Sequence, residues 1–297
     1  MNFGNILIGL MPMIGWGIFP VLVGKIGGKP VNQIIGTTYG TLVFAVITAM
    51  FTGAWFPNDT KTLVFSIISG ACWATAQIIT FYVFTLMGVS RTMPITTGFQ
   101  LIGASLFAVL FRGSWATSQA KLIGFSAMIL IIIGVYLTAW SEKKETGSAK
   151  KGVMKGIIFL LIGEIGYLGY SAFPQSVNAD GMHAFLPQAI GMAIAGTIYG
   201  LYITFSPKEK PFAERTSYMN IISGFFFAFA ALTLLISMQT SVNGMATGFV
   251  LSQTSAIVAT LGGIYILKEK KTNKEMTAVI IGLLLIVIAG SATAFIK

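Results

Sequence analysis

The chain is a succession of apolar runs separated by short polar segments. Ten of these runs are 20 to 26 residues long. A helix rises about 1.5 Å per residue, so roughly 20 apolar residues span a hydrocarbon layer about 30 Å thick. The pattern predicts an all-α integral membrane protein with ten transmembrane helices. They would cover residues 3–23, 34–56, 63–87, 92–111, 122–141, 153–173, 184–205, 218–238, 242–267 and 276–296.

Basic side chains are concentrated in alternate loops. Of the 19 Lys and Arg residues, 15 lie in the odd-numbered loops or directly beside them (Lys155 is the third residue of the sixth run), and 4 lie in the even-numbered loops and at the ends. Cytoplasmic loops of membrane proteins carry the excess of Lys and Arg. We therefore expect the odd-numbered loops to face the cytoplasm and both termini to face outside.

The two halves of the chain share short motifs in the same order. Residues 7–9 match 161–163, residues 36–40 match 196–200, residues 69–70 match 223–224, and residues 97–99 match 247–249. With five helices in each half, the second half enters the membrane from the opposite side, an inverted repeat typical of alternating-access transporters. We expect a single transmembrane domain, residues 1–297, with a substrate site near the midplane between the halves. It would consist of repeat 1 (1–141), a linker (142–152) and repeat 2 (153–297).

Composition excludes several classes of function. Hydrophobic residues make up 55% of the chain and charged residues 9%, whereas soluble domains average about 25% charged residues. The net charge of +10 is explained by the loops, so we expect the lipid bilayer and no nucleic acid as a partner. The chain has one cysteine, Cys72, and no recognisable nucleotide-binding loop, zinc motif or nucleophile triad. We therefore expect no cofactor, no metal, no catalytic residue and no enzyme activity.

Glu164 is the only acidic residue within the ten runs. It lies eleven residues after Val153, which places it close to the middle of the membrane. Desolvation there favours the neutral form, and a carboxyl group that gains and loses a proton can couple transport to a proton gradient. We expect Glu164 to be the proton-coupling residue. The alternative is a permanently protonated side chain that bonds to a neighbouring helix.

Uncharged polar and aromatic side chains also occur within the runs. Amides donate and accept hydrogen bonds without a charge, which suits the hydroxyl groups of a sugar, and aromatic rings can stack on its apolar face. For the amides the alternative is a bond between helices, and for the aromatic residues it is anchoring in the lipid interface. The candidate substrate-binding residues are Trp16, Trp73, Gln77, Gln100, Tyr167 and Gln253.

Longer motifs in both halves resemble one known family. They comprise residues 69–77 (with Trp73 and Gln77), 88–101, 246–253 and 260–276. Together they are similar, over essentially the whole chain, to the glucose/ribose porter family of the drug/metabolite transporter superfamily. The resemblance implies a multi-pass protein of the bacterial cell (inner) membrane that takes up a monosaccharide, ribose or glucose, with protons. The glucose-type members lack an acid at the position of Glu164, so the resemblance does not itself assign the proton to this residue.

Three other functions fit the same pattern less well. A proton-coupled exporter of drugs or cationic metabolites would bind its substrate with Glu164 and aromatic rings rather than with amides. A membrane-embedded enzyme would need a cluster of reactive groups, which a single acid does not provide. A passive facilitator would carry the sugar without concentrating it. We therefore expect secondary active uptake of a monosaccharide by alternating access.

Overall fold

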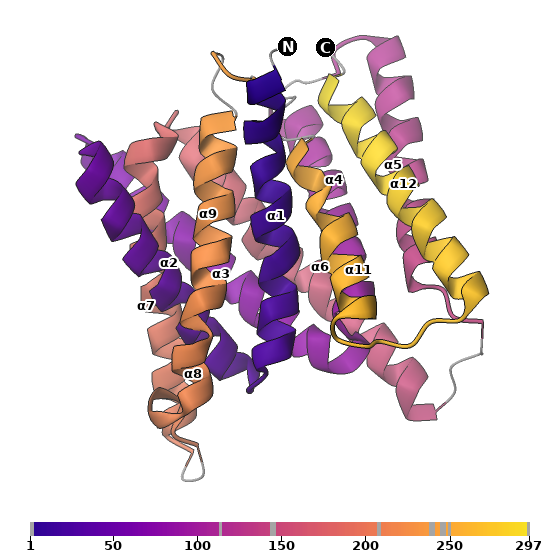
Figure 1. Ribbon diagram of the computed structural model, residues 1–297. Helices are drawn as coiled ribbons and strands as arrows, with labels where there is room; N and C mark the ends of the chain where they lie inside the picture. The colour runs from indigo at the N-terminus through magenta and orange to yellow at the C-terminus, as the bar shows by residue number, and fades with distance from the viewer. Residues whose placement is uncertain are drawn as a thin grey trace.

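The computed structural model describes residues 3–112, 115–142, 147–206, 209–237, 241–243, 248 and 251–295. These residues form helices and connecting segments and contain no strand, which confirms the all-α prediction. The long helices run side by side through the molecule (Figure 1). They are α1 (Phe3–Ile26), α2 (Pro30–Thr52), α3 (Thr60–Met87), α4 (Val89–Arg112), α5 (Ser118–Ala139), α6 (Gly147–Ser176), α7 (Gly181–Thr204), α9 (Ile221–Ser237) and α12 (Asn273–Phe295), and three shorter elements are η1 (Pro211–Ala213), α8 (Arg215–Met219) and α11 (Ser255–Tyr265).

Eight helical stretches in the described residues are long and apolar enough to cross a membrane. They are α1, α2, α3, α5, residues 150–176 of α6, α7, α8 together with α9, and residues 273–292 of α12. Helix α4, with 24 residues, and α11, with 11, stand at the fourth and ninth predicted positions. Helix α6 begins at Gly147, inside the stretch predicted as a linker. The other linker residues from 143 to 146 lie outside the described part of the chain.

Local sequence explains where several helices begin and end. The side chains of Asp59 and Thr117 accept hydrogen bonds from the first turns of α3 and α5, as N-cap residues do. Helix α2 ends at Gly53, whose φ of 74° is the left-handed conformation that favours glycine. Asn220 separates α8 from α9, and its amide donates to the carbonyls of Thr216 and Gly27.

The helices pack in pairs that take one partner from each half. Helix α3 packs against α6 and α7, α9 packs against α1 and α2, α1 packs against α11, and α4 packs against α6. Helices α5 and α12 lie together at one edge of the bundle, and α2 and α7 lie at the opposite edge (Figure 1). Large apolar side chains such as Ile129 and Ile165 are exposed on the outside, as expected of a surface that contacts lipid.

Glycines allow two helix pairs to touch backbone to backbone. A Cβ atom added at Gly70 of α3 would lie 1.9 Å from the backbone oxygen of Gln188 in α7, and one added at Gly191 would lie 1.9 Å from that of Ile67. Where α2 crosses α9, a Cβ at Gly224 would lie 2.2 Å from the backbone oxygen of Thr37. Small residues at helix crossings give this close approach in membranes.

We predict that the same substitution has different effects at two glycines. Gly70→Ala forces α3 away from α7 and should destabilise the protein by about 1–3 kcal/mol, as overpacking does. Gly163→Ala on α6 adds a Cβ whose nearest neighbour is 3.5 Å away, so it should be neutral or stabilising. Thermal unfolding in detergent measures both, and equal melting temperatures for the two variants would contradict the prediction.

Candidate functional site

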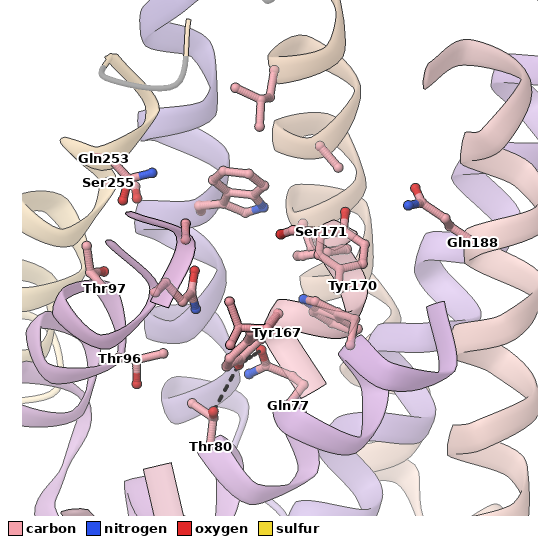
Figure 2. A pocket seen from close by; sticks show the side chains of 18 of the residues that line it. Gln77, Thr80, Thr96, Thr97, Tyr167, Tyr170, Ser171, Gln188, Gln253 and Ser255 are labelled. Carbon is pink, nitrogen blue, oxygen red and sulfur yellow. Dashed lines mark hydrogen bonds between the residues drawn. The ribbon is translucent and has the colours of Figure 1, made fainter. Parts of the chain in front are cut away.

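A cavity of about 300 Å³ lies between the helices. Side chains from α1, α3, α4, α6, α7, α9 and α11 line it, together with Gln253, which precedes α11. Amide, hydroxyl and aromatic groups of these side chains face one another around the space (Figure 2). All seven residues predicted from the sequence are among those that line this one cavity: Trp16, Trp73, Gln77, Gln100, Glu164, Tyr167 and Gln253.

The cavity extends from the middle of the bundle toward one end. Trp73 and Gln77 lie near the middle of α3. Pro174 and Gln175, by contrast, lie in the last turn of α6, and Phe185 lies in the second turn of α7. The end reached by the cavity is therefore the one at which α6 ends and α7 begins.

Gln77 and Tyr167 are joined by a hydrogen bond. The Tyr167 hydroxyl donates to Gln77 Oε1 at 2.8 Å and lies 2.9 Å from Thr80 Oγ1 (Figure 2). Gln77 is 5% exposed and Tyr167 8%. The sequence suggested Tyr167 as a ring that stacks on the substrate, whereas the structure also shows its hydroxyl committed to an amide.

Glu164 is buried against α4. Its side chain is 8% exposed, and neither carboxylate oxygen bonds to any residue that the structure describes. Gly103 faces it so closely that a Cβ there would lie 2.7 Å from Glu164 Oε1. A buried ionised carboxylate without a partner is strongly unfavourable, so this position favours the protonated form.

The two tryptophans meet Phe227 of α9. The ring of Trp73 packs on Phe227 with centroids 4.1 Å apart and planes 35° apart, and Trp16 lies 6.4 Å from the same ring. Phe227 therefore covers one face of Trp73 and leaves less of it for a ligand. The indole nitrogen of Trp16 is buried and bonds to none of the described residues.

Several lining residues were missed by the sequence analysis. Gln188 of α7 lies in an apolar run and carries the same signal as the three predicted glutamines, so the criterion already used would have found it. The hydroxyl groups of Thr80, Thr96 and Ser171 carry no such signal, because threonine and serine also bond to their own helix. Phe227 is indistinguishable in sequence from a packing residue.

Polar contacts close the other end of the bundle between the α1–α2 and α7–α8 loops. Lys29 forms an ion pair with Glu209, and this hydrogen bond raises the pKa of Lys29, which therefore stays charged. Asn32 Nδ2 donates to Glu214 Oε2 at 2.9 Å, and Asn220 Nδ2 donates to the Gly27 carbonyl at 3.2 Å. Both amides thus join the first half to the second.

A second set of contacts joins α4 to the loop after α11. The Glu269 carboxylate accepts hydrogen bonds from the backbone amides of Val89 at 2.7 Å and Ser90 at 2.9 Å. These are the first residues of α4, where free amides and the helix dipole favour an anion. Gly88 precedes them, and a Cβ there would lie 2.8 Å from the same carboxylate. The contact again joins one half to the other.

A sequence comparison identifies the family. A family described as "Sugar transport protein" matches residues 7–296, nearly the whole chain. The chain belongs to this sugar transport family. It is a multi-pass protein of the bacterial cell membrane, as the sequence predicted.

Three relatives match this chain over the full length of both sequences. The identity is 70% for Latilactobacillus sakei subsp. sakei strain 23K, 57% for Enterococcus faecalis strain V583 and 54% for Staphylococcus aureus strain Mu50. Each of these three relatives is named "Putative ribose uptake protein RbsU".

One solved crystal structure of a protein has a similar fold. Its TM-score is 0.63, and the alignment covers 99% of this chain and 97% of that chain at 14% identity. At this identity the similarity concerns the fold alone.

Proposed function

We propose that this protein takes up a monosaccharide, with ribose as the first candidate, by secondary active transport coupled to protons. The observation that carries the proposal is a cavity lined by neutral amides, hydroxyls and aromatic rings, together with one carboxyl group that has no hydrogen-bond partner among the described residues. A sugar exchanges its water for such partners without needing a charge. The ribose uptake named for relatives 54–70% identical supports ribose over other sugars.

The ten-helix inverted repeat is part of this proposal, and the helix contacts support it. In the proposed repeat α1 corresponds to α6, α2 to α7, α3 to α9 and α4 to α11. When corresponding helices are exchanged, the pair α3–α6 becomes α9–α1, the pair α3–α7 becomes α9–α2, and the pair α1–α11 becomes α6–α4. All six pairs are in contact. Transporters of this kind bind their substrate near the midplane between the repeats. Residues from both halves of the chain line this cavity, which supports the proposal.

Alternating access requires two ends that open in turn, and the two ends here differ. The cavity extends toward the end at which α6 ends, although Asn5 and Asn243 also join the halves there. At the other end the halves are joined by the Asn32–Glu214 contact and by the Glu269 contact with the start of α4. The Lys and Arg count assigns the closed end to the cytoplasm. We therefore assign this conformation to the outward-facing state, in which the Glu269 contact with α4 is part of the closed inner gate.

Glu164 is the proposed proton carrier. It lines the same cavity as the amides, so a proton and a sugar would enter from the same side. Its burial disfavours the ionised form, so in the proposed cycle the carboxyl group is protonated while the sugar-loaded carrier reorients, and it releases the proton on the inner side before the empty carrier returns. A passive facilitator would not need this group.

We predict that Glu164→Gln abolishes accumulation but keeps exchange. A pH gradient of one unit can sustain about a tenfold accumulation when one proton moves with each sugar. In proteoliposomes the variant should reach a ratio near 1 while counterflow of labelled ribose continues. Asp59→Asn is the matched control, because it also removes one carboxylate and asparagine still caps α3.

Other outcomes would contradict parts of this proposal. Normal pH-driven accumulation by Glu164→Gln would remove the residue from coupling. Wild-type uptake that ignores an uncoupler would indicate a facilitator. Binding of quaternary ammonium compounds, without competition by sugars, would support a cation exporter in which Glu164 and the tryptophans hold the substrate.

A second prediction concerns the inner gate. Glu269→Gln replaces one of two accepting oxygens with an N–H2 group and removes the charge, so the start of α4 should open more often. Hydrogen bonds to charged groups contribute about 1.5–3 kcal/mol, which corresponds to roughly tenfold or faster exchange of the Val89 and Ser90 amides. Hydrogen-exchange mass spectrometry measures this rate.

The matched control for the gate is Lys270→Gln. Lys270 is exposed in the same loop, so this change also alters the charge by one unit without removing an acceptor from α4. Equal exchange rates in wild type and Glu269→Gln would show that the carboxylate does not hold the gate.

A further inference from the structure

The side-chain amide of Gln188 bonds to a serine hydroxyl group that already donates its hydrogen to another acceptor. Gln188 Nε2 donates to Ser69 Oγ at 3.1 Å, and Ser69 Oγ donates to the backbone carbonyl of Tyr170 at 2.6 Å. A carbonyl only accepts, so the single Ser69 hydrogen points to Tyr170 and only a lone pair faces Gln188. The amide of Gln188 is therefore fixed with its nitrogen toward Ser69.

The carbonyl of Tyr170 needs this bond because of a proline. In a helix the carbonyl of residue 170 would accept from the amide of residue 174, but Pro174 has no N–H. Ser69, completely buried on α3, supplies the missing donor from the neighbouring helix. The direction of the Ser69 hydroxyl is thus determined by the backbone of α6.

The opposite end of the Gln188 amide remains available. Gln188 lines the cavity, and its Oε1 accepts no hydrogen bond from the described residues. Figure 2 shows the side chain extending from α7 toward the space beside Tyr170 and Ser171. Gln77 has the reverse arrangement, because its Oε1 accepts from Tyr167 and its N–H2 group is the end that remains.

We propose that Gln188 is a further sugar-binding residue that accepts a hydrogen bond from a hydroxyl group, and that Ser69 is the positioning residue that fixes its orientation. The inference rests on the proposed sugar uptake and assigns a direction to two of the hydrogen bonds between the site and the sugar. One sugar hydroxyl would act as a hydrogen donor to Gln188, and another would act as an acceptor from Gln77.

Fluorinated sugars test these hydrogen-bond directions. A fluorine in place of a hydroxyl group accepts weakly but cannot donate, whereas a hydrogen does neither. At the hydroxyl bound by Gln188, the deoxyfluoro and deoxy analogues of ribose should compete equally poorly. Each should be about tenfold weaker than ribose, as expected when a buried acceptor is left unpaired. At the hydroxyl bound by Gln77, the deoxyfluoro analogue should compete better than the deoxy analogue.

The variants then link the effect to Ser69. In counterflow by proteoliposomes, Ser69→Ala should raise the KM for ribose about 3- to 10-fold with little change in the maximal rate, because the released amide must be reoriented. It should also let the fluoro analogue regain affinity, since the freed N–H2 group can turn toward fluorine. In a Gln188→Leu background, Ser69→Ala should change the KM less than about 2-fold, as expected for residues that act as one unit.

Ser66→Ala is the matched control. Ser66 lies one turn earlier on α3, is completely buried, and its hydroxyl has no partner among the described residues. The same substitution there should leave the KM and the analogue pattern unchanged.

Three results would overturn the inference. Equal effects of Ser69→Ala in the wild-type and Gln188→Leu backgrounds would show that Ser69 does not act through Gln188. Fluoro analogues that all compete as well as ribose would show that no hydroxyl donates to the site, and this arm needs no variant. Absence of sugar uptake by the wild type would overturn the proposed function itself. If the wild type takes up sugar but the effects of Ser69→Ala and Gln188→Leu on the KM are additive, only the role of Ser69 and Gln188 is overturned.

Discussion

The direct contact of α3 with α7 is the constraint on which the site depends. In lipid no hydrophobic effect drives two helices together, so close packing has to do so. Gly70 lets the backbone of α3 meet that of α7 at Gln188. Ser69 directly precedes Gly70, and its hydroxyl group accepts a hydrogen bond from the side-chain amide of the same Gln188. The contact that packs the two helices therefore also places the Gln188 amide on the wall of the cavity, with the Ser69 hydroxyl buried behind it.

Much of the cavity could be predicted from sequence because lipid leaves polar side chains few places to go. An amide or a carboxyl within an apolar run almost always faces the protein interior. Gln77, Gln100, Gln253 and Glu164 obey this rule and line one cavity. The all-helical fold followed from the length of the runs. In lipid, backbone N–H and C=O groups must form hydrogen bonds to one another, which only helices and closed β-barrels allow, and runs of about 20 residues fit helices.

Details set by contacts between helices could not be predicted. The sequence gives no sign that Phe227 covers one face of Trp73 or that the Tyr167 hydroxyl bonds to Gln77. The break at Asn220 lies within a predicted run and depends on a carbonyl 193 positions away, that of Gly27. The sequence also could not tell whether prolines interrupt the helices. In the structure α1, α4 and α6 continue past their prolines, which are Pro12, Pro20, Pro94 and Pro174.

The proline in the last part of α6 links the orientation of an amide in the cavity to the backbone bonding of the neighbouring helix. Any other amino acid at Pro174 offers an amide hydrogen to the Tyr170 carbonyl, which then no longer depends on the Ser69 hydroxyl for a donor. Gln188 could then turn over and present hydrogens where it had presented an oxygen. Within a family of related porters, selection for a new sugar can therefore act at Pro174, through the backbone bonding of a helix, while Gln188 itself is conserved.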